Sequence, residues 1–217
     1  MTLADFMFYI GIDLGQRIDY TAIAVVERRQ HVLHGFDHLH WLQTTQKLPD
    51  EWAVRRLERV PLGTPYTKVV DRLAELARHP KLLGHCRMVI DATGVGAPVV
   101  DMLKSADIGC EIVPVVFSAG AQESFDGKTW RVPKLDLLAR LQMLFEQERI
   151  KVPRKLKESS ALVRELLDIK AKPRPRGNVR IGADGAGQHD DLVMALALAV
   201  WMGRSRKPSP VVPKRLI

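Results

Sequence analysis

Three acidic positions of the chain have the residue type and the placement for metal-ion chemistry. Asp13 lies at the end of one short apolar run, Asp91 lies at the end of another, and Asp190 and Asp191 open a long apolar stretch. In an open α/β sheet, ligand sites form at the ends of strands. If the first two runs are neighbouring strands, Asp13 and Asp91 lie side by side. A helix packed against them then brings Asp190 or Asp191 into the same cluster.

Clustered carboxylates favour a bound divalent cation. Like charges a few ångströms apart repel one another, and a cation is the usual means of neutralising them. Oxygen ligands with open coordination positions suit Mg²⁺ or Mn²⁺. Two such ions roughly 3.5–4 Å apart hold the attacking and the leaving oxygen of a phosphodiester. The acidic positions therefore predict two-metal phosphodiester hydrolysis.

Each acidic residue also has an ordinary structural interpretation. Asp13 precedes Leu-Gly and would suit a turn, while Asp91 would cap the turn that follows it. Asp190 or Asp191 is a natural N-cap for the apolar helix that follows. Asp19 is similarly interpreted as a turn residue, with weak metal binding as the alternative. The occurrence of all three acidic positions at element ends favours a common site over three separate structural roles.

The overall charge indicates a polyanionic partner, with nucleic acid as the first candidate. The 217 residues carry 33 Lys and Arg against 25 Asp and Glu, a net charge of +8. At 46% hydrophobic and 27% charged residues, the chain has the composition of a globular protein with one domain or two small ones.

Five residues are candidates for contacts with DNA. Lys134 opens a predicted helix just after a strand, where it would reach the scissile phosphate, and His189 precedes the acidic pair. Arg174, Arg176 and Arg180 lie in a basic segment that would follow phosphates. A solvated lysine, a solvated histidine and a plain solvated loop are the competing interpretations. No segment resembles a base-reading helix, so we expect little sequence specificity.

Cysteine usage and hydropathy exclude several classes of protein. Cys86 and Cys110 are the only cysteines, which excludes a thiolate metal cage and a disulfide framework and favours a reduced, cytoplasmic compartment. The N-terminus has no basic region before its apolar stretch, so it is not a signal peptide. The longest apolar stretch, Leu192 to Met202, is too short to span a bilayer.

The hydrophobic pattern predicts a mixed α/β sheet flanked by helices. A meander of short connections comes first, and a strand–helix–strand order follows, so antiparallel and parallel pairs should both occur. Strands are expected at 8–14, 20–28, 31–40, 86–91 and 110–117, and helices from 65 to 80, at 97–104, 133–148 and 157–169, and from 190 onward. Residues 170–187 suggest a hairpin or flexible loop, 1–203 form the domain, and 204–217 form a basic, Pro-rich tail that we expect to be disordered.

Four strings of the sequence resemble the nuclease domain of phage terminase large subunits. They are IGIDLGQRIDYTAIAVV, MVIDATGVGAPVVDML, IVPVVFS with the following VPKLDLLARLQMLFEQERIKVP, and GQHDDLVMALALAV. The likeness extends from about Phe8 to Met202, and HDDLVMALALA after a Gly-rich loop is its strongest part. The resemblance implies a ribonuclease H-like fold with a five-stranded mixed sheet in the order 3-2-1-4-5.

The resemblance also implies a function. Terminase nucleases cut concatemeric viral DNA by metal-ion catalysis during genome packaging, in the cytoplasm of a bacterial host. By resemblance, Asp13, Asp91 and the pair Asp190 and Asp191 match the acidic metal-binding positions, and His189 matches an outer or substrate-facing position. Which member of the pair binds metal directly is left open. The implied partners are double-stranded DNA, a packaging ATPase domain or subunit, and the portal, with no membrane.

The chain departs from the terminase pattern in one respect. Terminase large subunits carry an N-terminal packaging ATPase, and a Walker A motif requires a glycine, four further residues and then Gly-Lys-Ser/Thr. The only near match is Gly127-Lys128-Thr129, where Gln122 occupies the position of that glycine. We therefore expect either an excised nuclease domain or a separately encoded one.

Three other functions fit parts of the pattern. Another ribonuclease H-like nuclease, such as a Holliday-junction resolvase, would share the carboxylates and differ in substrate preference. The string GIDLG also resembles the phosphate-binding hairpin of the actin and sugar-kinase superfamily, which needs a second such domain. A non-catalytic DNA-binding packaging module would bind DNA whether or not divalent ions are present.

Overall fold

A computed structural model describes most of the chain. The described residues are 2–15, 19–37, 42–94, 96–118, 120, 122–173, 179–182 and 189–204. The tail residues 205–217 and the basic residues Arg174 and Arg176, singled out in the sequence, lie outside the described part.

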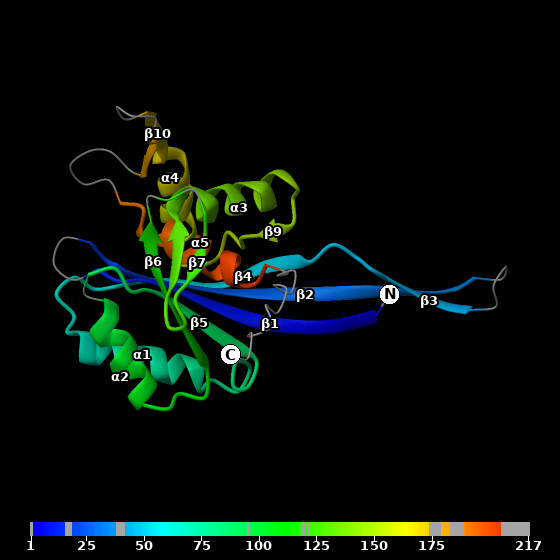
Figure 1. The fold of residues 1–217 in the computed structure, drawn as a ribbon, viewed down its shortest axis with the longest axis horizontal. Helices are drawn as coiled ribbons and strands as arrows, with labels where there is room; N and C mark the ends of the chain where they lie inside the picture. Colours follow the sequence, from blue (N-terminus) through cyan, green and yellow to red (C-terminus); the bar gives the residue numbers. More distant parts are fainter. Residues whose placement is uncertain are drawn as a thin grey trace, which may run out of the picture.

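A nine-stranded mixed sheet runs through the molecule, and a separate two-stranded hairpin accompanies it. The order of the large sheet is β7-β8-β6-β5-β1-β2-β4-β9, and β3 pairs with β2. The strands are β1 (Thr2–Asp13), β2 (Thr21–Asp37), β3 (Leu42–Lys47), β4 (Glu51–Val60), β5 (Cys86–Asp91), β6 (Glu111–Ser118), β7 (Ser124–Phe125), β8 (Trp130–Pro133) and β9 (Ile150–Lys151), with β10 (Lys170–Pro173) and β11 (Val179–Gly182) in the hairpin. In Figure 1, β2 and β3 extend away from the helices as a long arm.

The predicted order 3-2-1-4-5 is confirmed at the centre of this sheet, as β4-β2-β1-β5-β6, but β4 and not residues 31–40 occupies the place of the third strand. β1 pairs with β2 antiparallel and with β5 parallel, and β5 pairs with β6 parallel. The sheet is larger than the five strands expected, because β3, β7, β8 and β9 add short pairings at its margins.

The second and third predicted strands are one continuous strand, β2, so their separation was wrong. Arg29 and Gln30 fall between the two expected ranges, and Arg28 ends the first of them. In the structure each has a partner: Arg28 contacts Asp50, Arg29 contacts Glu27, and the Gln30 amide donates to the Leu48 carbonyl at 2.5 Å. Because β2 itself and the β3–β4 connection supply partners for these polar groups, the strand continues through them.

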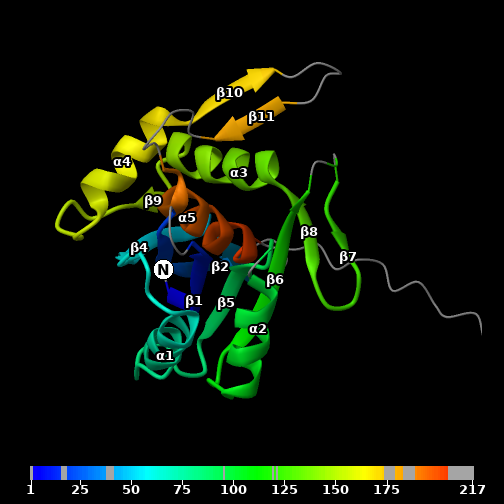
Figure 2. The ribbon, with the colours of Figure 1, turned by 90° about the vertical axis from the view of Figure 1, so that its left-hand side faces the viewer.

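The helices α1 (Tyr66–Ala77), α2 (Gly96–Ser105), α3 (Lys134–Glu146), α4 (Ser159–Asp168) and α5 (Asp191–Met202) lie close to the predicted ranges. Figure 2 shows α1 and α2 on one face of the sheet and α5 on the other, with α3 and α4 stacked outside α5. Every residue of α5 is buried, as its continuous apolar sequence predicts. None of the helices in the described part of the chain combines the length and hydrophobicity that a membrane span requires.

Alternation along the strands divides the core into two clusters. Tyr9 on β1 and Val89 on β5 pack with α5, whereas Ile10 and Ile90 pack on the opposite side with α1 and α2. Successive side chains of a strand point to opposite faces. Residues at odd positions near the ends of β1 and β5 therefore face α5.

Gly11 on β1 allows α5 to lie directly on the sheet. A Cβ atom at this position would stand 1.8 Å from the Ala195 carbonyl oxygen and 2.7 Å from the Ala199 nitrogen, both in the α5 backbone. Only a residue without a side chain permits this approach. The start of α5 is consequently held against the ends of β1 and β5.

The apolar spacing of α4 marks its buried face only in part. Leu162 is buried and Leu166 packs against the core, whereas Val163 and Leu167, which belong to the same apolar spacing, are exposed. The face toward the core also carries Glu165, whose carboxylate has partners there. A buried acidic residue is invisible to a search for apolar spacing.

The two cysteines meet although they lie 24 residues apart in the sequence. Cys86 begins β5 and Cys110 precedes β6, and their Sγ atoms are 2.8 Å apart, with both thiols free. Separation along the chain does not prevent this contact, because β5 and β6 are parallel neighbours.

Candidate metal centre

Asp13 and Asp91 end two neighbouring parallel strands. Ile12 of β1 is the Cα partner of Ile90 of β5, so the next residue of each strand is an aspartate. By alternation both carboxylates face α5, because Gly11 and Val89 do so two residues earlier. The predicted side-by-side placement of these two aspartates follows from this register.

The other predicted acidic residues lie close enough to Asp13 for their charges to act on its carboxyl. Burial raises the pKa of the Asp13 carboxyl well above its ordinary value, and the charges of Asp91, Asp191 and Asp190 raise it further. The Lys134 ammonium lowers it in part. Such mutual repulsion is relieved when a cation binds among the carboxylates.

Asp91 also has a local role in the turn after β5. Its Oδ1 accepts a hydrogen bond from the Thr93 backbone N–H at 2.8 Å, so this carboxylate does cap the turn. Burial raises the pKa of Asp91, while the Thr93 hydrogen bonds and the Lys134 charge lower it. The turn-capping and site interpretations therefore apply to the same residue.

Asp190 and Asp191 direct their carboxylates away from their own helix. Asp190, at the N-cap position of α5, makes no capping hydrogen bond, and its Oδ2 lies 2.7 Å from Lys134 Nζ. Asp191 Oδ2 accepts the backbone N–H of Tyr20 at 3.3 Å. Burial raises the pKa of Asp191 to about 6, although the His189 charge opposes this. Asp190 thus occupies the N-cap position that the structural interpretation assigned to the pair, but neither carboxylate caps the helix.

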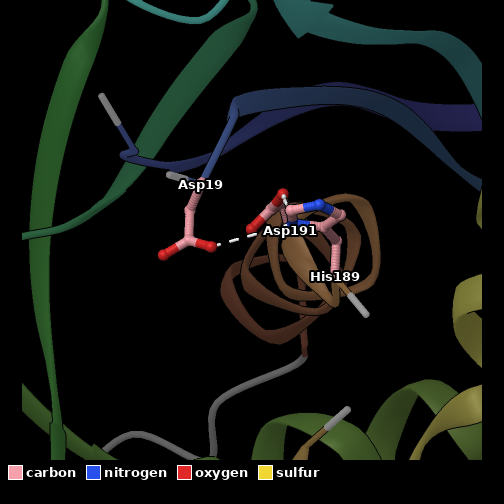
Figure 3. Close-up of side chains that lie close together, drawn as sticks. All are labelled: Asp19, His189 and Asp191. Atoms are coloured by element: carbon pink, nitrogen blue, oxygen red, sulfur yellow. Dashed lines mark ion pairs between the residues drawn. The ribbon is translucent and has the colours of Figure 1, made fainter. Parts of the chain in front are cut away.

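Three side chains at the start of α5 form a compact group of potential metal ligands. Figure 3 shows Asp19 reaching from the β1–β2 connection toward His189 and Asp191. His189 Nδ1 lies 3.7 Å from Asp19 Oδ1 and 3.6 Å from Asp191 Oδ2, and one ligand atom from each residue falls within 4.8 Å of the others.

The buried Nδ1 atom of His189 tests whether a cation would fit this group. It has no hydrogen-bond partner among the described residues, although the carboxylates of Asp19 and Asp191 lie 3.7 and 3.6 Å away. A buried polar atom without a partner is costly and calls for a ligand. Two carboxylates and an imidazole suit Mn²⁺, and the carboxylates suit Mg²⁺.

Sequence reasoning missed three residues around this group. Tyr20 follows Asp19 and contributes its backbone N–H, Arg59 lies over the Tyr20 ring, and Glu165 reaches the α5 backbone. One sequence signal pointed to this region: Asp19, a second aspartate in the turn shortly after Asp13, lies next to Tyr20. Arg59 and Glu165 sit among many other charged residues and give no such signal.

The structure places the candidate DNA-contact residues in different regions. Lys134, the first residue of α3, lies within the acidic cluster, and His189 lies beside it. Arg180 is on β11, in the hairpin outside the large sheet.

In the Gly127-Lys128-Thr129 segment, backbone N–H groups are hydrogen-bonded to a neighbouring side chain of the same loop. Asp126 Oδ1 accepts the backbone N–H groups of Lys128 and Thr129 at 3.0 and 2.8 Å. A phosphate-binding loop needs such N–H groups open to the ligand. This arrangement agrees with the absence of a Walker A motif.

Comparison with known proteins gives a consistent result. The chain is 27% identical over 195 residues to the terminase large subunit of Thermus phage G20c, an alignment that covers 90% of this chain and 31% of that protein. The chain resembles the nuclease domain of terminase large subunits. A structure of the large terminase nuclease of phage G20c with bound magnesium is 26% identical, with a TM-score of 0.59, and the match covers 91% of this chain and 82% of that one.

Other solved terminase nucleases share the fold. The nuclease domain of the bacteriophage SPP1 large terminase, solved with bound Mn, has a TM-score of 0.51 at 14% identity and covers 90% of this chain and 86% of that one. The ribonuclease H-like fold is thereby confirmed, and terminase neighbours hold Mg or Mn. The chain spans about a third of the length of its curated terminase relatives. No protein-family model matches it.

Proposed function

We propose that this chain is a metal-dependent endodeoxyribonuclease of the terminase type, which cuts concatemeric viral or prophage DNA during genome packaging. The observation that carries the proposal is the register that places Asp13 and Asp91 at the ends of neighbouring parallel strands, on the face covered by α5, at whose start Asp190 and Asp191 lie. The likeness to terminase nucleases solved with bound Mg or Mn supports the same function.

The four aspartates are the proposed metal ligands, and two ions of Mg²⁺ or Mn²⁺ are the proposed cofactors. Besides burial, the charges of Asp91, Asp191 and Asp190 all raise the pKa of the Asp13 carboxyl, so Asp13 would hold the ions together with these residues. His189 and Asp19 extend the ligand set beside Asp191. When bound, such ions lower the pKa of a water and stabilise the charge on the leaving 3′ oxygen.

The remaining residues position the cluster and the substrate. Lys134 holds the Asp190 carboxylate and places a positive charge where a DNA phosphate would approach. Arg174, Arg176 and Arg180 are proposed to follow the DNA backbone, in keeping with the net charge of +8. The proposed partners are double-stranded DNA, a packaging ATPase domain or subunit and the portal, in the cytoplasm of the bacterial host.

Plasmid cleavage tests this function. Purified protein should convert supercoiled plasmid to nicked and linear forms with Mn²⁺ or Mg²⁺, and EDTA should stop the reaction. Asp91→Asn should abolish cleavage, because it removes a negative ligand while keeping the size of the side chain. Asp101→Asn, on the exposed face of α2, is the matched control and should cleave normally.

Two results would contradict the proposal. Full cleavage by folded Asp91→Asn would remove Asp91 from the site. Plasmid binding that is indifferent to divalent ions, together with no cleavage at any concentration of either metal, would instead favour the non-catalytic DNA-binding module.

A further inference from the structure

The helix α5 begins without the cap that its sequence provides. An aspartate at the N-cap position normally accepts the N–H of the second or third helical residue, here Leu192 or Val193. Asp190 occupies that position, but its carboxylate is turned to Lys134. The first carboxylate of the helix, Asp191, is turned to the Tyr20 backbone.

Glu165 of α4 supplies the missing acceptor. Its Oε2 accepts the Val193 N–H at 2.9 Å, so it takes the donor that Asp190 would otherwise bind. The residue is 4% exposed, and its second oxygen, Oε1, pairs with the Arg59 guanidinium from β4. A carboxylate at a helix N-terminus is also favoured by the partial positive charge there.

Arg59 links this cap to the metal-binding group. Its guanidinium lies 5.2 Å from the centroid of the Tyr20 ring, and that ring meets the edge of His189 at 5.5 Å between centroids. The Tyr20 backbone in turn holds Asp191. The contacts thus run from the cap of α5 to the side chains at its start.

We propose that Glu165 is a positioning residue: it caps α5 in place of Asp190, and so leaves the Asp190 and Asp191 carboxylates free to face substrate and metal. The capping itself stands on the contacts above, and its consequence for metal rests on the proposed function. Without an acceptor from α4, the buried Val193 N–H would draw the Asp190 carboxylate back to its own helix, because an unsatisfied buried N–H is costly. That movement would break the contact with Lys134.

Two variants that differ only in the acceptor test this role. Both carry Arg59→Met, so that no unpaired buried charge remains. Glu165→Gln keeps an oxygen for the Val193 N–H, whereas Glu165→Leu fills the space without one. We expect the Glu165→Leu variant to bind Mn²⁺ about tenfold or more weakly than the Glu165→Gln variant, by calorimetry, in line with the loss of partners that orient metal ligands.

A crystal structure of each double variant gives a readout that does not depend on metal. The Asp190 carboxylate should remain on Lys134 in the Glu165→Gln variant and should move to the Val193 N–H in the Glu165→Leu variant. If the Glu165→Leu variant fails to crystallise, adding Asp190→Ala to both variants gives the same distinction by NMR. Hydrogen exchange at Val193 should become faster in the Glu165→Leu variant, where Asp190 is the acceptor, and should stay slow in the Glu165→Gln variant.

Glu27 is the matched control for the loss of a buried ion pair. It is 7% exposed and pairs with Arg29 and Arg55, and it lies on the face of the sheet away from α5. Glu27→Leu in an Arg55→Met background should lower the melting temperature and leave the Mn²⁺ affinity unchanged. A similar loss of affinity in this control would mean that any weakening of the fold is sufficient.

The outcomes separate this inference from the proposed function. Equal Mn²⁺ affinity of the two Glu165 variants, with Asp190 on Lys134 in both, would overturn the inference. If the unaltered protein binds no Mn²⁺, the proposed function fails, and the position of Asp190 in the two variants still decides whether Glu165 replaces its cap.

Discussion

Lys134 Nζ lies 2.7 Å from Asp190 Oδ2, which joins the first residue of α3 to the residue before α5. The same ammonium lowers the pKa of both Asp13 and Asp91, so its charge acts on carboxylates from three separate elements. A lysine at this point therefore compensates part of the repulsion within the cluster.

Lys134→Met should shift the pH dependence of metal binding to higher pH. Removing the positive charge raises the pKa of Asp13 and Asp91 further, so a higher pH is needed to ionise them. We expect the midpoint of Mn²⁺ binding to rise by about one pH unit. Calorimetric titrations between pH 5 and pH 8 measure this shift. Lys68→Met, which removes a lysine paired with Asp71 on α1, should leave the midpoint in place.

Asp191→Asn should stabilise the metal-free protein at neutral pH. The folded-state pKa of about 6 exceeds the ordinary value of 3.8, so the folded protein binds more protons than the unfolded chain between these values. Stability due to this group is therefore greatest below pH 4 and falls as the pH rises through 6. The shift of about two units corresponds to at most about 3 kcal/mol.

Urea unfolding in EDTA at pH 4, 5 and 7.5 checks this stability prediction. The advantage of Asp191→Asn over the unaltered protein should grow as the pH rises. A constant difference across this range would show that the carboxyl does not titrate as its burial implies.

Asp19→Asn and His189→Gln should each weaken Mn²⁺ binding about tenfold while the fold is kept. Both side chains offer a ligand atom to the group with Asp191. Because they would serve one ion, the double variant should lose less than the product of the two single effects. Unchanged affinity in both single variants would confine metal binding to the aspartates at the strand ends and the start of α5.

Gly11→Ala should destabilise the protein by about 3 kcal/mol or more, since a new Cβ would overlap the α5 backbone. Thermal unfolding followed by circular dichroism measures the loss. Gly120→Ala is the control, because the nearest atom to its Cβ would be 3.9 Å away. A melting temperature for Gly11→Ala equal to that of the control would show that α5 can shift at no cost.

Much of the fold could be predicted because its signals are local. The apolar runs that end at Asp13 and Asp91 mark strands, and the continuous apolar sequence after Asp191 marks a buried helix. No strand is predicted for the residues of β4. Many of its side chains are charged, and they obscure the pattern of the buried residues Trp52, Val54 and Leu57. Pairing with β2 is what makes this segment a strand.

The sequence by itself determined which residue types stand at the ends of the strands and at the start of α5. The approach of α5 to Gly11, the direction of each aspartate and the cap from Glu165 were decided by tertiary structure. Arg59 and Glu165 are 106 residues apart, and Glu165 and Val193 are 28 residues apart. Periodicity in the sequence reports which face of a segment is apolar, whereas a hydrogen bond between distant segments depends on how the packed elements bring donor and acceptor together.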